Sequence, residues 1–594
     1  MKRLLIPIVV LFVGCGEAEE LSREEIIERI NDTGIITEEQ MQSLGMQPFI
    51  NLTGITMLSD QQAESLSNRY KVIIINSLTS VTDKQAETLS KVPAELTLNG
   101  LTSITDKQAK SLSKVKHLAL NGLTTITDEQ ASQVGKVESL CLDGLTLITD
   151  TQAESLSQVR RLQLKGLTSI TDKQAEILSR NAKLELNGLT SITDMQAEIL
   201  STVRYLVLNG LTSVTDKQVE TFSKVKFLSL YGLTSLSDQQ AKSLSMVEDL
   251  KISEACREQI KLYQQKVVDK INSSGNITDE KAKTLSTVEE LSLNGLTSVT
   301  DEQLGFLSQV EHLSLKGLTF ITDKQAEILS RNGSLELNGL PSITDKQAEI
   351  LSKVRYLQLN GLPSITDMQA EILSKVRYLQ LNGLPSITDM QAEILSTVQA
   401  ELTLNGLTLI TDKQAENLGK VEHLSLKGLT SITDMQAEIL SRNGSLELNG
   451  LQSITDKQAE ILSKVRYLQL NGLTSVTDKQ VKTLSKVKSL HLNALTSITD
   501  EQTESLSYLE LLELNGLTSI TDEQLKILSE VEILSLGGLT SIANNQAEIL
   551  SKVRYLQLSG LTSVSDEQAK SLSKVEDLTV SEALQPLIDK YKKP

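Results

Sequence analysis

A single sequence motif repeats along nearly the whole chain, and its fixed period limits what the chain can fold into. The stretch LQLNGLPSITDMQAEILSKVRY, from Leu357 to Tyr378, recurs in variant form from about Phe49 to the C-terminus. The leucine after its glycine returns every 22 residues, at Leu101, Leu123, Leu145, Leu167, Leu189, Leu211 and Leu233. A fixed period in this range is typical of solenoids, in which each unit buries its apolar face against its neighbours.

The first half of the repeat predicts a strand followed by a turn. In Leu357–Asn360, apolar residues alternate with polar ones, which is the period of a half-buried strand. Gly361 then permits a tight turn. Leu362 and Ile365 follow at spacings that suit neither a strand nor a helix, so we expect them to attach an irregular connection to the core.

The second half of the repeat predicts a short helix. Thr366 can cap it, and Gln369, three residues on, can reach back to the amide of the capping residue. Asp367 suits the positive end of the helix dipole, while Ala370 and Leu373 share one helical face. A helix this short is marginal alone, so packing against neighbouring repeats must hold it. The unit is therefore a strand, a turn and a short helix, with the strands stacked in parallel.

This pattern resembles a leucine-rich repeat. The order V-x-x-L-x-L-x-x-L-x-x-I-T-D-x-x-A-x-x-L is carried by Val354, Leu357, Leu359, Leu362, Ile365, Thr366, Asp367, Ala370 and Leu373. It is most similar to the cysteine-containing subtype, which has ITD after its conserved cysteine, but Leu362 stands where that cysteine or an asparagine would be. The resemblance covers roughly nine tenths of the chain. It implies an α/β solenoid of 22–23-residue units with a parallel sheet on one face, and it leaves function open because such folds host many binding roles.

The N-terminus predicts export and a lipid anchor. Lys2 and Arg3 precede an apolar run, Leu4–Val13, that is too short to span a bilayer and fits a signal peptide over residues 1–14. The ending resembles a bacterial lipoprotein signal, which implies lipidation of Cys15, with simple secretion as the alternative. Gly16, rather than aspartate, favours the outer membrane or the cell surface over the periplasm under the sorting rule of diderm bacteria. Residues 15–25 are acidic and are interpreted as a tether.

Two adjacent segments in the middle of the chain resemble the sequences near its two ends: the first resembles the C-terminal region and the second the N-terminal region. Val247–Ala255 matches Val575–Ala583 near the C-terminus, and Val267–Glu280 matches Ile26–Glu39 near the N-terminus. Solenoid ends need capping elements, so we predict two capped arrays that meet near Tyr263–Val267. The arrays would span residues 26–266, with about ten strands, and 267–594, with about fourteen. One continuous array with a helical insertion is the alternative.

Composition excludes some partners. The net charge of −18 and the pI of about 5.0 argue against nucleic acid, whose phosphates need a basic stripe. Cys141 lies in a predicted strand and Cys256 about five repeats later, so we expect neither a disulfide nor a metal pair.

No catalytic constellation stands apart from the repeat. His117, His312 and His423 precede the first strand leucine, while His491 lies between the two strand leucines. All four should point to solvent in isolation, which favours surface histidines over metal ligands or general bases.

The repeated aspartates of the ITD motif could suggest a calcium ladder, but a helix start explains them without metal. Asp106, Asp172 and Asp367 are examples. We therefore expect no enzyme activity, no metal and no cofactor.

The sequence favours a non-enzymatic envelope scaffold that binds a protein or glycan partner through its strand face. The alternative is a structural or self-associating surface protein in which the repeats mainly provide length. Since aromatic and arginine side chains dominate binding hot spots, the best candidate for a partner-binding patch lies late in the first array. The predicted residues are Tyr205, Val207, Phe227, Tyr231, Arg161, Gln163 and Lys165. The competing interpretation is that the rings cover the stack near its cap.

Overall fold

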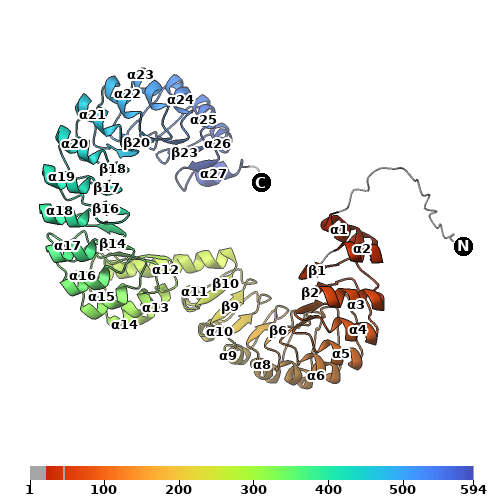
Figure 1. The fold of residues 1–594 in the computed structure, drawn as a ribbon. Coiled ribbons are helices and arrows are strands. Elements are labelled where there is room, and N and C mark those ends of the chain that lie inside the picture. The colour runs from red at the N-terminus through yellow and green to blue at the C-terminus, as the bar shows by residue number, and fades with distance from the viewer. Residues whose placement is uncertain (1–21, 45–46, 593–594) are drawn as a thin grey trace, which may run out of the picture. The chain divides into compact units, whose positions relative to one another are not determined.

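The computed structural model describes residues 22–44 and 47–592, and these residues form the predicted strand–turn–helix units. Cys15 and the predicted signal peptide lie outside the described residues. The chain divides into two compact units, Met1–Gln265 and Lys266–Pro594. Each unit holds one parallel sheet, with its strands in chain order. The strands lie on the inner side of each unit's curve and the helices on the outer side (Figure 1).

The strands are short and regularly spaced. The ten strands of the first sheet are β1 (Phe49–Asn51), β2 (Val72–Ile74), β3 (Glu95–Thr97), β4 (His117–Ala119), β5 (Ser139–Cys141), β6 (Arg161–Gln163), β7 (Lys183–Glu185), β8 (Tyr205–Val207), β9 (Phe227–Leu230) and β10 (Asp249–Ile252). The fourteen strands of the second sheet are β11 (Glu290–Ser292), β12 (His312–Ser314), β13 (Ser334–Glu336), β14 (Tyr356–Gln358), β15 (Tyr378–Gln380), β16 (Glu401–Thr403), β17 (His423–Ser425), β18 (Ser445–Glu447), β19 (Tyr467–Gln469), β20 (Ser489–His491), β21 (Leu511–Glu513), β22 (Ile533–Ser535), β23 (Tyr555–Gln557) and β24 (Asp577–Thr579).

One short helix follows most strands. The helices up to the unit boundary are α1 (Arg23–Thr33), α2 (Glu38–Ser43), α3 (Asp60–Arg69), α4 (Asp83–Leu89), α5 (Asp106–Leu112), α6 (Asp128–Val134), α7 (Asp150–Leu156), α8 (Asp172–Leu178), α9 (Asp194–Leu200), α10 (Asp216–Phe222), α11 (Asp238–Leu244) and α12 (Glu254–Ser274). The later helices are α13 (Asp279–Leu285), α14 (Asp301–Leu307), α15 (Asp323–Leu329), α16 (Asp345–Leu351), α17 (Asp367–Leu373), α18 (Asp389–Leu395), α19 (Asp412–Leu418), α20 (Asp434–Leu440), α21 (Asp456–Leu462), α22 (Asp478–Leu484), α23 (Asp500–Leu506), α24 (Asp522–Leu528), α25 (Asn544–Leu550), α26 (Asp566–Leu572) and α27 (Gln585–Asp589). Among the helices of the described ranges, none has the length and hydropathy needed to cross a membrane.

The core is the aliphatic stack that the repeat predicts. Leu357, Leu359, Leu362, Ile365 and Leu373 are all buried. Each such leucine packs against its counterparts in the neighbouring repeats, and full burial of one leucine contributes about 2 kcal/mol. The connection between strand and helix is therefore attached to the core as expected.

The repeat glycine is needed for a close backbone approach. A Cβ atom on Gly361 would lie 2.3 Å from the carbonyl oxygen of Asn338 and 2.8 Å from that of Leu340. Asn360 and Gly361 form the predicted turn, and it needs no left-handed conformation, since positive φ is confined to Gly34 and Gly275 among the described residues. One repeat carries Ala494 at this position, so a methyl group is accommodated there after local adjustment.

The predicted helix cap is confirmed, and it also joins the repeats. The hydroxyl of Thr366 accepts from the backbone amide of Gln369 at 3.1 Å, while Oε1 of Gln369 accepts from the backbone amide of Thr366 at 3.0 Å. Nε2 of the same glutamine donates to the carbonyl of Ile343 in the preceding repeat at 2.9 Å. The glutamine side chain is buried, so both of its polar ends are satisfied there.

An asparagine ladder runs beside the strands. The backbone amide of Asn360 donates to Oδ1 of Asn338 at 3.0 Å, and the backbone amide of Asn382 donates to Oδ1 of Asn360 at 2.9 Å. The leucine-rich-repeat pattern predicts a cysteine or an asparagine at the position of Leu362. In this chain the ladder asparagine, Asn360, lies two residues earlier. A side chain bonded to the next repeat's backbone fixes the register of successive strands.

Two elements differ from the sequence interpretation at their boundaries. Helix α1 begins at Arg23, inside the segment interpreted as a tether, because Ser22 and Glu25 form a capping box. Helix α12 is one continuous helix of 21 residues where the sequence suggested one array's end followed by another's beginning. The boundary between the compact units falls within it, after Gln265.

Candidate binding surface on the first sheet

The parallel register collects the predicted residues on neighbouring strands. Arg161 of β6 pairs with Lys183 of β7, which pairs with Tyr205 of β8, which pairs with Phe227 of β9. A second row, two residues on, holds Gln163, Glu185, Val207 and Ser229. Residues two apart on a strand share a face, so both rows lie on the side of the sheet away from the leucine core.

The aromatic part of the surface is a contact between two rings. The centroids of Tyr205 and Phe227 lie 5.8 Å apart with an interplanar angle of 34°, and the guanidinium carbon of Arg204 lies 5.5 Å from the Tyr205 centroid. Tyr231 is 53% exposed, whereas Val207 is only 8% exposed and lies beneath its neighbours. Three of the four predicted apolar residues are thus accessible to a partner, and the valine supports them.

The polar part of the surface is organised around the buried carboxylate of Glu185. Its oxygens lie 2.8 Å from Nζ of Lys183 and 3.5 Å from Nζ of Lys165, and Oε1 accepts from Nε2 of Gln163 at 3.2 Å. Lys165 also lies 3.6 Å from Asp143. Burial disfavours the charged ammonium of Lys165, but the carboxylates of Asp143 and Glu185 outweigh burial and raise its pKa. Lys165 and Gln163 are therefore held in place rather than free.

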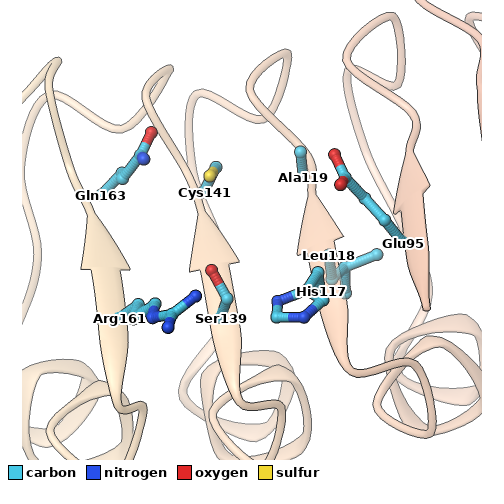
Figure 2. A pocket seen from close by; sticks show the side chains of 8 residues that line it. All are labelled: Glu95, His117, Leu118, Ala119, Ser139, Cys141, Arg161 and Gln163. Atoms are coloured by element: carbon cyan, nitrogen blue, oxygen red, sulfur yellow. The ribbon is translucent and has the colours of Figure 1, made fainter. Parts of the chain in front are cut away.

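A hollow of about 330 Å³ adjoins this surface on strands β3 to β6. Figure 2 shows the short side chains of Ala119, Ser139 and Cys141 among longer ones, which come from the flanking strands β3 and β6 and from the start of β4. The longer side chains are Glu95, His117, Arg161 and Gln163. The hollow arises because small residues occupy two successive strands, and it shares Arg161 and Gln163 with the predicted patch.

The chemistry of the hollow suits binding. Burial, assisted by the carboxylate of Asp143, raises the pKa of the Cys141 thiol to about 11, so the nucleophilic thiolate is scarce at neutral pH. No group of three or more metal-ligating side chains occurs within residues 22–44 and 47–592. Arg161 is exposed and makes no ion pair with another described residue. Its guanidinium is thus free to bind an acceptor that enters the hollow.

The histidines lie in the predicted columns, but one of them is not exposed. His117, His312 and His423 begin strands β4, β12 and β17. The side chain of His491 is 15% exposed, with Nδ1 2.9 Å from Oε2 of Glu513 on the next strand. The hydrogen bond from His491 is the main cause that lowers the pKa of Glu513. The expectation that every histidine points freely to solvent was therefore wrong for His491, because it lies opposite a carboxylate on the adjacent strand.

The repeated aspartates take part in hydrogen bonds between repeats. The hydroxyl of Thr127 donates to Oδ1 of Asp106 at 3.3 Å, and that of Thr193 donates to Oδ1 of Asp172 at the same distance. In each case the threonine is the N-cap of the following repeat's helix. The aspartate column thus has a structural role that requires no cation.

The repeating unit, the parallel sheets and the aliphatic stack define a leucine-rich-repeat solenoid. No family model matches the chain, and no curated protein matches it. Among solved structures, the chain is similar to an internalin from Listeria monocytogenes, with 17% identity and a TM-score of 0.31. The similarity covers 53% of this chain and 93% of the internalin. At this level the likeness supports no argument about a partner or a role, and the assignment to the solenoid class rests on the repeating unit, the parallel sheets and the aliphatic stack.

Proposed function

We propose that the protein is a non-enzymatic cell-envelope scaffold that binds a protein or glycan partner through the strand face of its first sheet. The observation that carries the proposal is the row from Arg161 to Phe227 across β6–β9, where the rings of Tyr205 and Phe227 touch; exposed Tyr231 directly follows β9. Aromatic residues make up only 3% of the chain, so two on adjacent strands and a third directly after the second strand are a marked local enrichment.

The proposed partner would meet a surface with two kinds of contact. The rings of Tyr205, Phe227 and Tyr231 offer apolar area with little side-chain entropy to lose, which suits a hot spot. The Arg161 guanidinium and the adjoining hollow offer a place for a polar or acidic group. Since Lys165 and Gln163 are already bonded to Glu185, they would set the shape of the surface more than its affinity.

The proposed location is the cell envelope, with the mature chain attached through lipid at Cys15. The support is the N-terminal sequence alone: a basic start, an apolar run and Gly14–Cys15. An outer-membrane or surface position would present the strand face to a soluble or surface-bound partner.

The test is a pull-down from envelope extracts with the mature protein and its variants. The combined variant Tyr205→Ser, Phe227→Ser and Tyr231→Ser should retain less than about a tenth of the captured partner, because hot-spot truncations each remove about 2 kcal/mol. A matched control replaces exposed residues of the helix side, Met195→Ser and Met435→Ser, and should capture as much as the wild type. Equal capture by all forms would refute the surface. A large fall in melting temperature of the triple variant would instead identify the rings as packing.

A structural role is the second candidate, and one observation favours it. Residues 355–376 and 377–398 carry almost the same sequence, so adjacent strands β14 and β15 present identical side chains. Such copying lengthens a surface without diversifying it. Sedimentation velocity of the mature protein would reveal concentration-dependent self-association if the repeats mainly provide length.

A further inference from the structure

An arginine–tyrosine pair recurs at the start of five strands. In each pair the arginine directly precedes the first strand residue, and its guanidinium carbon lies 4.9–5.5 Å from the tyrosine centroid. The pairs are Arg204–Tyr205, Arg355–Tyr356, Arg377–Tyr378, Arg466–Tyr467 and Arg554–Tyr555. A cation over a ring face fixes both side chains on the surface.

Two of these pairs lie on adjacent strands of the second sheet. Tyr356 and Tyr378 are register partners on β14 and β15, and their rings stack with centroids 4.0 Å apart and an interplanar angle of 12°. Arg355 and Arg377 therefore also follow one another at the spacing of parallel strands, about 4.8 Å between backbones. We call these four residues the arginine–tyrosine surface.

The two cations of this surface lack a carboxylate partner. Neither Arg355 nor Arg377 forms an ion pair with any residue that the structure describes. Gly333 and Ala400 flank them in the same column, since Ser334 pairs with Tyr356 and Tyr378 with Glu401. In a chain of net charge −18, two adjacent arginines without a counter-charge are a local exception.

The same pair elsewhere in the second sheet is neutralised. Arg554 donates to Glu532 at 2.7 Å and to Glu576 at 2.9 Å. These glutamates directly precede β22 and β24, the two strands that flank β23. The hydrogen bond to Glu576, followed by that to Glu532, raises the pKa of Arg554 above its usual value. The Arg554–Tyr555 pair thus shows what this motif looks like when its charge is already satisfied.

The hydroxyl groups of the stacked tyrosines affect each other's ionisation. Their mutual interaction raises the pKa of Tyr356 and lowers that of Tyr378, and the guanidinium of Arg355 also lowers the pKa of Tyr378. A phenol hydroxyl can both donate and accept, so the pair can also meet a polar group of a partner. Beside the rings, Ser334, Gln358, Gln380 and Glu401 line a shallow hollow of about 80 Å³.

We propose that the arginine–tyrosine surface is a second docking surface, which binds the carboxylates of an acidic peptide segment in a protein partner. Two adjacent guanidinium forks match carboxylate acceptors, and neither arginine is paired with an acid among the described residues. A neutral glycan fits less well because it brings no carboxylate to the two arginines, and the stacking contact already takes one face of each ring. The carboxylate of Glu401 repels an anion at one end of the hollow and so directs the acidic segment toward the arginines.

The experiment measures binding of labelled peptides to the full mature chain by fluorescence anisotropy at low ionic strength. The probe is the heptapeptide Gly-Asp-Glu-Asp-Glu-Asp-Gly, and its control is the uncharged counterpart Gly-Asn-Gln-Asn-Gln-Asn-Gly with the same label. We expect the acidic peptide to bind at least about tenfold more tightly than the amide form. The double variant Arg355→Gln and Arg377→Gln should lose at least about tenfold in affinity for the acidic peptide.

Two further variants separate the proposal from a loss of folding. Arg554→Gln removes the same motif where it is already neutralised, and we expect its affinity for the acidic peptide to be unchanged. Tyr378→Phe keeps the ring stack and removes only the hydroxyl, and we expect a smaller loss of about threefold. Equal binding of both peptides, or equal loss in Arg554→Gln and the double variant, would overturn the proposal. So would binding of a polyuronate that the double variant abolishes while the acidic peptide fails to bind. None of these outcomes depends on the surface of the first sheet.

Discussion

The bond between a cap glutamine and the preceding repeat can be broken by one isosteric change. In Gln369→Glu the carboxylate can still accept from the Thr366 amide, so the capping box is retained. The change removes the donor that bonds the carbonyl of Ile343 at 2.9 Å and places an ionised oxygen near that carbonyl. The variant thus tests the contact between repeats with the helix cap left intact.

The size of the effect follows from burial. Gln369 is only 8% exposed, so the Ile343 carbonyl would be left without its partner in a largely water-excluded place. Leaving a buried acceptor unsatisfied costs about 2 kcal/mol, which is roughly a 30-fold change in an opening equilibrium. Long repeat arrays do not unfold as one unit, so a local measurement is needed.

The assay is hydrogen exchange with mass spectrometry on the peptide that covers α17. We expect the protection of its amides to fall about 30-fold in Gln369→Glu at neutral pH. Protonation would restore a donor, so the loss relative to the wild type should shrink near pH 4, about where carboxylates titrate. The control is Glu371→Gln on the exposed side of the same helix, which should change protection less than about twofold. Equal protection in the wild type and Gln369→Glu would refute the claim that this ladder holds the repeats together.

Three more predictions test other parts of the account. Cys15→Ser should abolish metabolic labelling by a fatty-acid analogue and release the chain from membranes, and labelling that persists would exclude lipidation at that residue. Fragments 22–265 and 266–594 should each be soluble and resist proteolysis, whereas two molten fragments from a stable full chain would favour one continuous array. Asn332 is buried, donates to the carbonyls of Leu307 and Val310, and has an unsatisfied Oδ1. Asn332→Val should lower local stability by about 2 kcal/mol, because the carbonyl of Val310 loses its donor, and Asn332→Asp should lower it further, by about 3 kcal/mol, because it also buries a charge; hydrogen exchange on the peptide that contains residue 332 measures both, and the reverse order would contradict this.

The period and the cap could be predicted because they depend on residues within one repeat. Thr366 and Gln369 are three residues apart, and their mutual hydrogen bonds are a local property of the sequence. The second bond of Gln369 could not be predicted the same way, since its acceptor at Ile343 is defined only once the stagger of neighbouring repeats is known. For the same reason the turn at Gly361 could be predicted, whereas the close approach of the preceding repeat's backbone to this glycine could not.

The boundaries of the helices at the two ends of the first unit were also predicted incompletely. Ser22 and Glu25 form a capping-box pattern that the sequence displays openly, and attention to it would have placed the start of α1 at Arg23. The continuous helix α12 is harder to foresee because the repeated end sequences suggested a break. No glycine or proline interrupts Glu254–Ser274, which is the signal that a single helix was possible.

The candidate surface was predictable in its columns but not in its contacts. The 22-residue period places Tyr205 beside Phe227, and the register agrees. Whether a side chain is free depends on the lengths and charges of its neighbours: Val207 is covered, and Lys165 is paired with Glu185. The hollow beside Arg161 required two successive strands with short side chains, which no single repeat reveals.

A partner that docks on the strand face of the first sheet must shield that face from solvent, and oxidative footprinting with the captured partner bound measures the shielding. Hydroxyl radicals modify exposed tyrosine, phenylalanine and methionine side chains, and mass spectrometry reads the modification residue by residue. We predict that Tyr205, Phe227 and Tyr231 lose most of their reactivity when the partner is bound. Met195 and Tyr508, which are 59% and 84% exposed outside the strands, should keep theirs. Protection of Met195 with unchanged reactivity of the three rings would place the partner on the helix side and contradict the claim.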